Sequence, residues 1–293
     1  MNHQTIDAHE VALIIEGGGM RAAVTAPAIV KLIEEDVRFG WVGGISAGSS
    51  HAANYLSGDA RRARESFTNF AGHPEFGGWG SFMRGRGYFN AEFIYENSAE
   101  DYLPYDFEAF LNHPAQLHIE GTRVDTGEGV AWTRKDIKEP VDLFKRVRAS
   151  STLPGLMRTP AIDGVHYVDG ALGSSGGLLI QAARDAGFSK FAVLSTRERG
   201  YRKPPVRSPR AVRQLARRTP AVAEAMINRP SRYNASAEQI ARLEKNGDAL
   251  VFHPTARLVS TGERDPEKLA GLYEEGRAQF EQEWPQWLEF LSA

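Results

Sequence analysis

The stretch of sequence that decides the fold reads VALIIEGGGMR and occupies residues 11–21. Its first five residues are apolar and of the kind found in strands buried on both faces of a parallel sheet. The glycine-rich turn leads into residues 22–35, whose apolar side chains recur at helical spacing. A second strand at 39–45, the turn GISAG at 44–48 and a helix at 47–56 repeat the pattern. This order of elements predicts a mostly parallel α/β sheet.

The rest of the chain continues with both kinds of element. Between residues 60 and 112, helix-compatible pieces surround a run rich in glycine and aromatic residues, which we interpret as a helical cover segment. Further strands and helices are predicted, in chain order, at 115–125, 129–133, 141–150, 166–168, 177–186, 190–195, 249–253 and 266–292. The sequence contains no internal repeat and no low-complexity linker. We therefore predict a single α/β domain over residues 1–293, with its core motifs at 11–171.

A basic insertion interrupts this pattern at about residues 197–232. From Arg197 to Arg218, nine basic residues accompany one acidic residue, Glu198. Three prolines there predict a loop that leads into a basic helix. Such a segment can attract anionic lipid head groups, at about 1 kcal/mol per basic residue near a charged surface. A solvated basic helix, or a partner for the acidic C-terminal helix, explains it equally well.

Composition excludes several classes of protein and site. The 293 residues include 35 Lys and Arg against 37 Asp and Glu, whereas a protein that coats nucleic acid is normally strongly basic. The chain holds no cysteine, which excludes disulfides, thiolate zinc sites and cysteine nucleophiles. No window approaches the roughly 18 apolar residues of a membrane span, and the first residues do not resemble a signal peptide. We therefore expect a cytoplasmic protein.

The turn GISAG at 44–48 has the form G-x-S-x-G and lies between a strand and a helix. A sharp turn of this kind forces the serine into a strained conformation, and the flanking glycines remove side chains that would collide across it. The hydroxyl of Ser46 would then project from the end of the sheet as a nucleophile. A serine that merely caps the helix in an ordinary glycine-rich turn is the alternative.

The second motif is Gly17-Gly18-Gly19, which lies 29 residues before Ser46. Three successive glycines after a buried strand expose several backbone N–H groups, which can bind a phosphate or an oxyanion. The stretch lacks the G-K-[ST] of a P-loop and the spaced glycines of a dinucleotide site. Together with a serine at the end of the next strand, it indicates an oxyanion hole at the carboxyl edge of the sheet.

A serine hydroxyl needs a base to become nucleophilic at neutral pH, and the sequence offers two arrangements. The order Ser46, Asp169, His253 matches the triad order of α/β-hydrolases. Alternatively, Asp169 acts directly, because it lies at a strand end and is followed by glycine. The early position of the serine turn, with the oxyanion loop on the strand directly before it, argues against the α/β-hydrolase plan.

Four segments together resemble the patatin-like phospholipase family: EGGGMR at 16–21, GISAG at 44–48, ASSTLPG at 149–155 and VDGA at 168–171. Two later segments, RPSRYN at 229–234 and DPEK at 265–268, resemble a bacterial subgroup of that family. The resemblance implies a three-layer α/β/α fold with a mostly parallel central sheet. It also implies Ser46 as nucleophile and Asp169 as general base.

The resemblance further implies an oxyanion hole formed by Gly17, Gly18, Gly19, Met20 and Arg21. The family usually has glycine after the arginine, whereas this chain has Ala22, whose methyl group could narrow the oxyanion loop.

The expected function is hydrolysis of carboxylic esters, with lipid or lysolipid acyl esters as substrates, no metal and no organic cofactor. Contact with a membrane surface is expected as an accompanying property, and binding to nucleic acid is not. Two alternatives remain: a triad esterase that uses His253, and a catalytically weak module that binds lipid or acyl groups. The aromatic run at 76–93 is either an apolar cover over the acyl chain or an irregular core segment.

Overall fold

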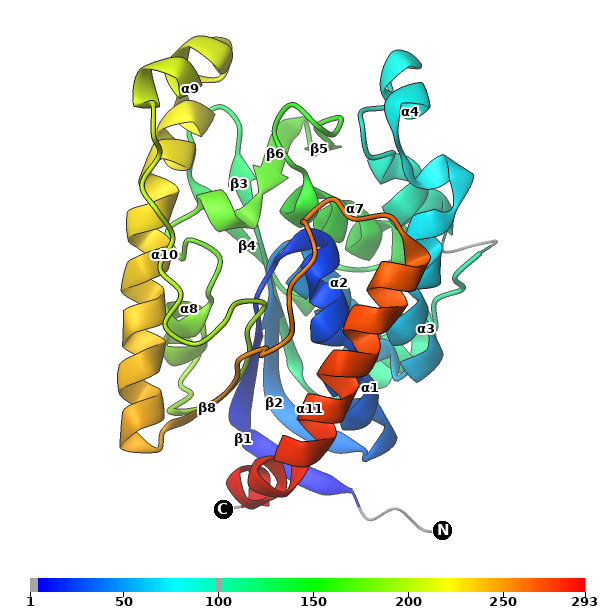
Figure 1. Ribbon diagram of the computed structural model, residues 1–293, viewed down its shortest axis with the longest axis vertical. Helices are drawn as coiled ribbons and strands as arrows, with labels where there is room; N and C mark the ends of the chain where they lie inside the picture. The colour runs from blue at the N-terminus through cyan, green and yellow to red at the C-terminus, as the bar shows by residue number, and fades with distance from the viewer. Residues whose placement is uncertain (1–4, 99–101, 293) are drawn as a thin grey trace.

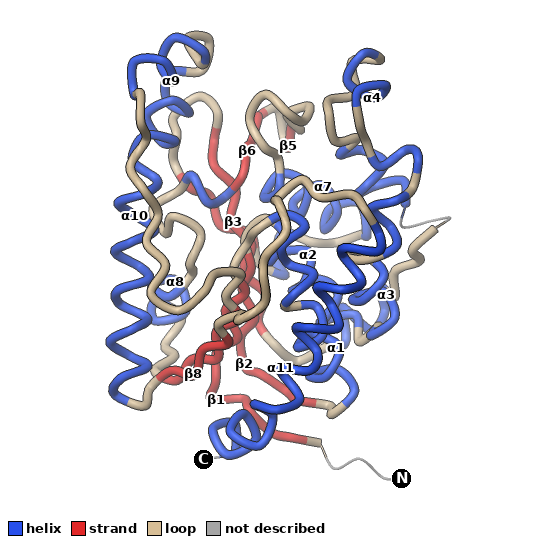
Figure 2. The backbone as a smooth tube through the Cα atoms, in the orientation of Figure 1, coloured by secondary structure: helices blue, strands red, loops and turns tan. Residues whose placement is uncertain are grey.

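The computed structural model describes residues 5–98 and 102–292. Eight strands form one central sheet in the order β5-β6-β3-β2-β1-β7-β8, with β4 paired to β3 (Figure 1 and Figure 2). The strands are β1 (Ile6–Ile15), β2 (Val37–Gly44), β3 (Gln116–Arg123), β4 (Gly129–Trp132), β5 (Ala161–Ile162), β6 (Val165–Asp169), β7 (Lys190–Leu194) and β8 (Ala249–Phe252). The strands predicted from the sequence are present, with ends shifted by a few residues.

The middle of the sheet is parallel, as predicted. β1 pairs in parallel with β2 and β7, and the parallel pairing continues to β3 and β8. The antiparallel pairs are β3 with β4, β3 with β6 and β5 with β6. Leu13 and Ile15 of β1 belong to one core cluster, and Ala12 and Ile14 belong to another. Since side chains alternate along a strand, these two clusters lie on opposite faces of the sheet.

Helices cover both faces and complete a three-layer α/β/α architecture (Figure 1). One face packs against α1 (Ala26–Glu34), α2 (Ala47–Ser57), α7 (Pro140–Ser151) and α11 (Pro266–Ser292). The other face packs against α8 (Ile180–Asp185) and α10 (Pro220–Asn246). This arrangement confirms the expected fold class.

The first helix begins later than predicted. Residues Gly19–Val24 form a 3-10 turn, η1, and α1 starts only at Ala26. The Thr25 hydroxyl donates to the Ala22 carbonyl at 3.0 Å. Pro27 occupies the first turn of α1, where a backbone N–H has no partner within the helix. The glycine loop therefore closes in a tight turn of its own before the helix begins.

The segment at 60–112 is largely helical, as predicted, and its residues 99–101 lie outside the described part of the chain. It comprises α3 (Ala60–Glu65), η2 (Asn69–Gly72), η3 (Pro74–Phe76), α4 (Trp79–Met83), the π-helical turn η4 (Phe93–Asn97) and α6 (Phe107–Asn112). The basic segment forms a loop, the short helix α9 (Pro209–Leu215) and the start of α10. Both α4 and α9 project at the end of the molecule where the parallel strands terminate (Figure 1).

The C-terminal helix α11 packs along the sheet with the face predicted from its sequence. All seven residues expected on its inner face are buried: Leu269, Leu272, Tyr273, Phe280, Trp284, Trp287 and Leu291. The two tryptophans therefore anchor the helix to the core. Across residues 5–98 and 102–292, no helix is both long and apolar enough to cross a membrane.

Candidate active site

Ser46 occupies the sharp turn between β2 and α2. Its backbone has φ 57° and ψ −128°, a conformation that non-glycine residues rarely adopt. The chain can turn this tightly because residue 48 is a glycine. A Cβ atom at Gly48 would overlap the Ile15 carbonyl oxygen of the neighbouring strand. Strain of this kind persists only when the surrounding structure enforces it, and it concentrates at functional sites.

Asp169 lies beside Ser46, although the two residues come from distant parts of the chain. β6 runs antiparallel to β3, and its last residue, Asp169, is paired with Gly121 near the carboxyl end of β3. The Ser46 hydroxyl lies close enough to the Asp169 carboxyl to lower its pKa, and both residues line one cavity. The Ala171 N–H donates to Oδ1 of this carboxylate at 2.9 Å and fixes the orientation of the side chain.

Asp169 is buried, and its surroundings favour the neutral acid. Burial raises the pKa of the Asp169 carboxyl above its ordinary value, because a charged group loses hydration there. The Arg229 guanidinium, the Ala171 N–H, the Ser46 hydroxyl and the Lys203 ammonium act in the opposite direction but do not cancel this effect. A carboxylate with a raised pKa accepts a proton more readily and is a stronger base.

The glycine loop passes directly over the serine turn. A Cβ atom at Gly17 would lie 2.8 Å from the Ser46 Cβ and 2.6 Å from the Ile45 carbonyl oxygen, so only glycine permits this approach. Among the described residues, no hydrogen bond engages the N–H groups of Gly17, Gly18 or Gly19. The Met20 N–H differs, because it donates to the Thr261 carbonyl at 3.0 Å. Of the residues expected in the oxyanion hole, Met20 thus has its amide occupied in this conformation.

Ala22, where the sequence departs from the family pattern, lies away from the two cavities at Ser46. It is fully buried in a cluster with Met20 and Val24 and does not line either cavity. Its carbonyl accepts from the Thr25 hydroxyl and lies 3.0 Å from the Nε2 atom of His51. Burial lowers the pKa of His51 to about 4, so this histidine is neutral at neutral pH.

Two cavities meet at Ser46. The first has a volume of about 280 Å³ and is mostly apolar, with walls that include Phe67, Phe70, Phe76, Phe89, Leu103 and Phe144. The second has a volume of about 260 Å³ and is lined by charged groups: Glu16, Arg21, Asp169, Arg197, Lys203 and Arg229. Ser46 and Arg229 line both cavities, which places the nucleophile candidate at their junction.

The aromatic run at 76–93 was expected to be either an apolar cover over the acyl chain or an irregular core segment, and its residues differ in burial. Phe76 and Phe89 are buried and line the apolar cavity. Trp79 and Phe82, both on α4, are exposed instead. Part of the run therefore forms a cavity wall, and part projects into solvent.

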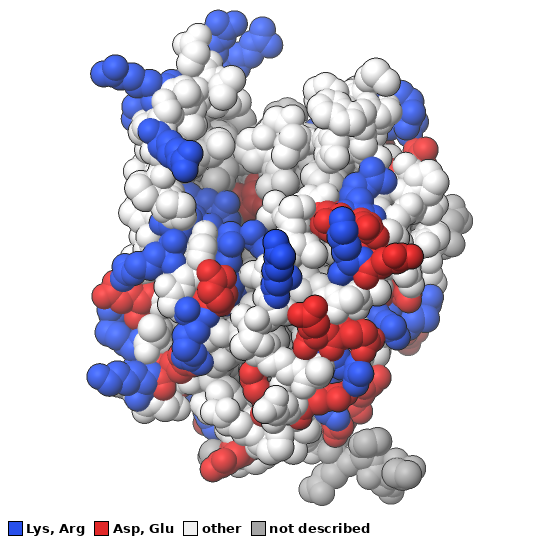
Figure 3. Space-filling model, viewed as in Figure 1, with Lys and Arg blue, Asp and Glu red and all other residues white. Residues whose placement is uncertain are grey.

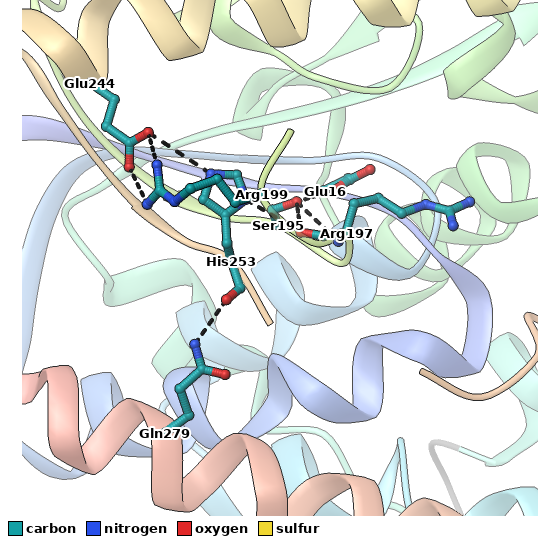
Figure 4. Close-up of polar contacts among 7 residues, drawn as sticks. All are labelled: Glu16, Ser195, Arg197, Arg199, Glu244, His253 and Gln279. Atoms are coloured by element: carbon teal, nitrogen blue, oxygen red, sulfur yellow. Dashed lines mark hydrogen bonds and ion pairs between the residues drawn. The ribbon is translucent and has the colours of Figure 1, made fainter. Parts of the chain in front are cut away.

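His253 lies far from Ser46, which overturns the triad alternative. It follows β8, which is three strands from β2, or about 14 Å at the usual strand spacing. Its Nδ1 atom lies 3.3 Å from the Arg197 carbonyl oxygen and its Nε2 atom 4.0 Å from the Glu244 carboxylate, as Figure 4 shows. His253 therefore belongs to a polar cluster with Arg199, Glu244 and Gln279 at the edge of the sheet.

Sequence reasoning missed several residues that surround Ser46 and Asp169. Arg197, Lys203 and Arg229 belong to the segment read as a basic insertion, and the structure brings their side chains to the second cavity. Another missed contributor is Thr261, whose carbonyl accepts from the Met20 N–H. The excess of basic residues at 197–218 was the available signal for Arg197 and Lys203. The number of charges in a segment does not, however, distinguish a buried cation from an exposed one.

A fold comparison finds the crystal structure of VipD from Legionella pneumophila, with 13% sequence identity and a TM-score of 0.49. The match covers 94% of this chain and 66% of that one, so the chain spans slightly less than two thirds of VipD. A search of curated proteins by sequence finds no match.

Two family models match the sequence. Residues 219–292 match a domain of unknown function, DUF6363. Residues 13–180, which are more than half of the chain, match the patatin-like phospholipase model. The chain therefore belongs to the patatin-like phospholipase family.

Proposed function

We propose that this protein is a serine hydrolase that cleaves lipid or lysolipid acyl esters, with Ser46 as nucleophile and Asp169 as general base. One observation carries the proposal. The hydroxyl of a serine in a strained turn lies beside a buried carboxylate of raised pKa, next to the glycine loop and at the mouth of an apolar cavity. Family membership supports the choice of acyl esters.

The reaction proceeds in two steps. Asp169 takes the Ser46 proton while Oγ attacks the ester carbonyl carbon, and the carbonyl π electrons move to its oxygen. The N–H groups of the Gly17–Gly19 loop stabilise this oxyanion, and removal of one such donor typically costs about 100- to 1,000-fold in rate. The oxyanion then collapses, and the alcohol leaves with the proton held by Asp169. Water, deprotonated by the same carboxylate, releases the acid and regenerates Ser46.

The apolar cavity fits the acyl part of the substrate. Its walls include many phenylalanine and leucine side chains, and its opening at Ser46 would bring an ester carbonyl to the nucleophile. Burial of each methylene of an acyl chain contributes about 0.8 kcal/mol. This wall favours a hydrocarbon chain over a polar acyl group.

We further propose that the protein meets its substrate at a lipid surface. Two elements project beside the site: α4, with Trp79 exposed by 72% and Met83 by 82%, and α9, with Leu215 exposed by 87%. Figure 3 shows Lys and Arg gathered over the α9 projection, whereas the α4 projection is largely uncharged. Apolar side chains beside arginines are the usual composition of a surface that binds anionic lipids.

The test is labelling with a fluorophosphonate probe and mass mapping of the labelled peptide in the wild type and in Ser46→Ala. Labelling confined to Ser46, with hydrolysis of p-nitrophenyl acyl esters that Ser46→Ala loses, would support the proposal. A folded wild-type protein that neither reacts with the probe nor hydrolyses any ester would overturn it. That outcome would favour the alternative of a module that binds acyl groups without cleaving them.

A further inference from the structure

Four cationic side chains line the second cavity. They are Arg21, Arg197, Lys203 and Arg229. Among the described residues, none of the four has a carboxylate within ion-pair distance. In Figure 4 the side chain of Arg197 extends past Glu16 and away from the Glu244 cluster. Ion pairs with carboxylates therefore do not neutralise the positive charge in this cavity.

The two carboxylates of the cavity are already engaged. Glu16 is buried and accepts from the Ser195 hydroxyl at 2.7 Å, the Thr196 N–H at 2.8 Å and the Tyr233 hydroxyl at 2.9 Å. Asp169 accepts from the Ala171 N–H. Even with both acids ionised, the cavity holds four cationic groups against two carboxylates.

The cations also retain unused hydrogen-bonding capacity. The Nε atoms of Arg21 and Arg229 are buried and have no partner in the part of the chain that the structure describes. The Nζ atom of Lys203 lies 4.6 Å from the centre of the Tyr233 ring, and the Arg197 guanidinium lies 4.1 Å from that of Tyr201. Aromatic faces hold these two cations in place without neutralising them. Like charges gathered in a half-buried cavity repel one another, and an anion between them relieves that cost.

We propose that this cationic pocket binds the head group of the ester and selects one whose net charge is negative, a phosphate monoester in preference to a zwitterionic phosphocholine. This inference rests on the proposed hydrolase function. Arginine binds phosphate oxygens through paired N–H donors, and lysine adds a point charge. A trimethylammonium group would find no unengaged carboxylate here and four like charges. With the acyl chain in the apolar cavity, the scissile ester then lies at Ser46, where the two cavities join.

The pocket also gives a role to the region that matches a domain of unknown function. Arg229 and Tyr233 come from α10, and Thr261 comes from the loop before α11, all within residues 219–292. Arg229 supplies charge, Tyr233 holds Glu16, and Thr261 fixes the Met20 amide at the glycine loop. This region therefore contributes directly to head-group selection.

The experiment compares two lysolipids with the same short acyl chain, an acylglycerol phosphate and an acylglycerophosphocholine. We measure kcat/KM for both in the wild type, Lys203→Met, Arg229→Gln and the control Arg184→Gln. Arg184 is an exposed arginine of α8 that lines neither cavity. We expect the wild type to prefer the phosphate monoester. Each pocket variant should lower the ratio of the two kcat/KM values at least about tenfold, as loss of a hydrogen bond to a charged group implies. The control should leave the ratio unchanged.

A second readout does not depend on catalysis. Inorganic phosphate is titrated calorimetrically into Ser46→Ala and into Ser46→Ala combined with Lys203→Met, with binding expected only in the first. The inference is overturned if the wild type hydrolyses both lysolipids through Ser46 with equal kcat/KM. The proposed function is unaffected by that result. Phosphate binding without a head-group preference also overturns the inference, because the pocket would then serve a free anion. If the wild type hydrolyses no ester although Ser46→Ala binds phosphate, the proposed function is overturned instead.

Discussion

The backbone N–H of Ser46 donates to the Oγ atom of Ser150 at 3.0 Å, across 104 positions of sequence. Two residues later, the Thr152 carbonyl accepts the N–H of Asp169 at 2.9 Å. The end of α7 therefore holds both members of the proposed dyad. The segment ASSTLPG at 149–155, which the sequence marks only by its resemblance to a family pattern, acts as the brace between nucleophile and base.

We expect Ser150→Ala to lower kcat and to leave KM nearly unchanged, because the Ser46 turn loses its anchor while both cavities stay intact. The unpaired N–H should also reduce the free energy of unfolding by about 1–3 kcal/mol. Ser57→Ala is the matched control: this buried serine of α2 donates to the Asn54 carbonyl, far from the turn. Denaturant titration and steady-state kinetics check both effects. Equal kcat in the two variants would show that Ser150 does not position Ser46 for the reaction.

Asp169→Asn should abolish most activity and yet stabilise the fold at neutral pH. Loss of the base predicts a fall in rate of at least about 100-fold. Because the folded-state pKa of Asp169 is raised, the folded protein resists ionisation that the unfolded chain undergoes freely, and stability falls as the pH rises above the unfolded pKa. Asparagine removes this penalty.

The melting temperature of Asp169→Asn should therefore exceed that of the wild type at pH 8, and the difference should shrink toward pH 4. A difference that grows toward acid pH would contradict the raised pKa. The rate of the wild type should correspondingly rise with pH as Asp169 ionises. Near wild-type turnover in folded Asp169→Asn would exclude Asp169 as the general base.

The sequence predicted those parts of the fold and site that are encoded locally. The apolar run before Glu16 and the glycines around Ser46 fix strand, turn and helix through backbone sterics within a few residues, and Asp169 was found because glycine follows a strand end. Arg229 and Thr261 could not be assigned in this way, since only the packing of α10 and the loop before α11 brings them to the glycine loop. The start of α1 was misjudged because Ala22 and Ala23 favour a helix, whereas tertiary contacts hold them in a 3-10 turn.

Gly17→Ala should impair catalysis far more than stability alone explains. Its new methyl group would press on Ser46 and the Ile45 carbonyl, and so displace the loop whose amides we propose as oxyanion donors. Gly271→Ala is the control, because no atom beyond its own helix backbone and chain neighbours lies within 4 Å of a Cβ at that position, and alanine favours a helix. We expect a loss in kcat for Gly17→Ala of about 100-fold, the scale of one lost oxyanion donor, and none for Gly271→Ala. Comparable kcat values in both would mean that the loop does not serve the reaction.

The exposed side chains of α4 should control binding to lipid surfaces. Trp79→Ser combined with Met83→Ser removes two large apolar groups from the projection, and we expect weaker cosedimentation with vesicles of mixed zwitterionic and anionic lipid. Leu111→Ser is the control, since Leu111 is 51% exposed but lies on α6, which precedes the amino end of β3 at the opposite end of the sheet. Activity on a water-soluble ester should not change in either protein. Vesicle binding that survives the α4 changes would exclude this element as the contact surface.

Lys203 should make head-group selection dependent on pH. Burial and the neighbouring Arg229, Arg197 and Arg21 lower the pKa of Lys203 to about 8, while Glu16 acts in the opposite direction. The ammonium is charged below that pH and neutral above it, whereas a phosphate monoester stays a dianion throughout, with its second pKa near 6. We therefore expect the kcat/KM ratio of acylglycerol phosphate to acylglycerophosphocholine to fall as the pH rises through about 8. In Lys203→Met, which lacks the titrating group, the ratio should be lower and flat over the same range. A ratio that falls equally in wild type and variant would assign the titration to another group.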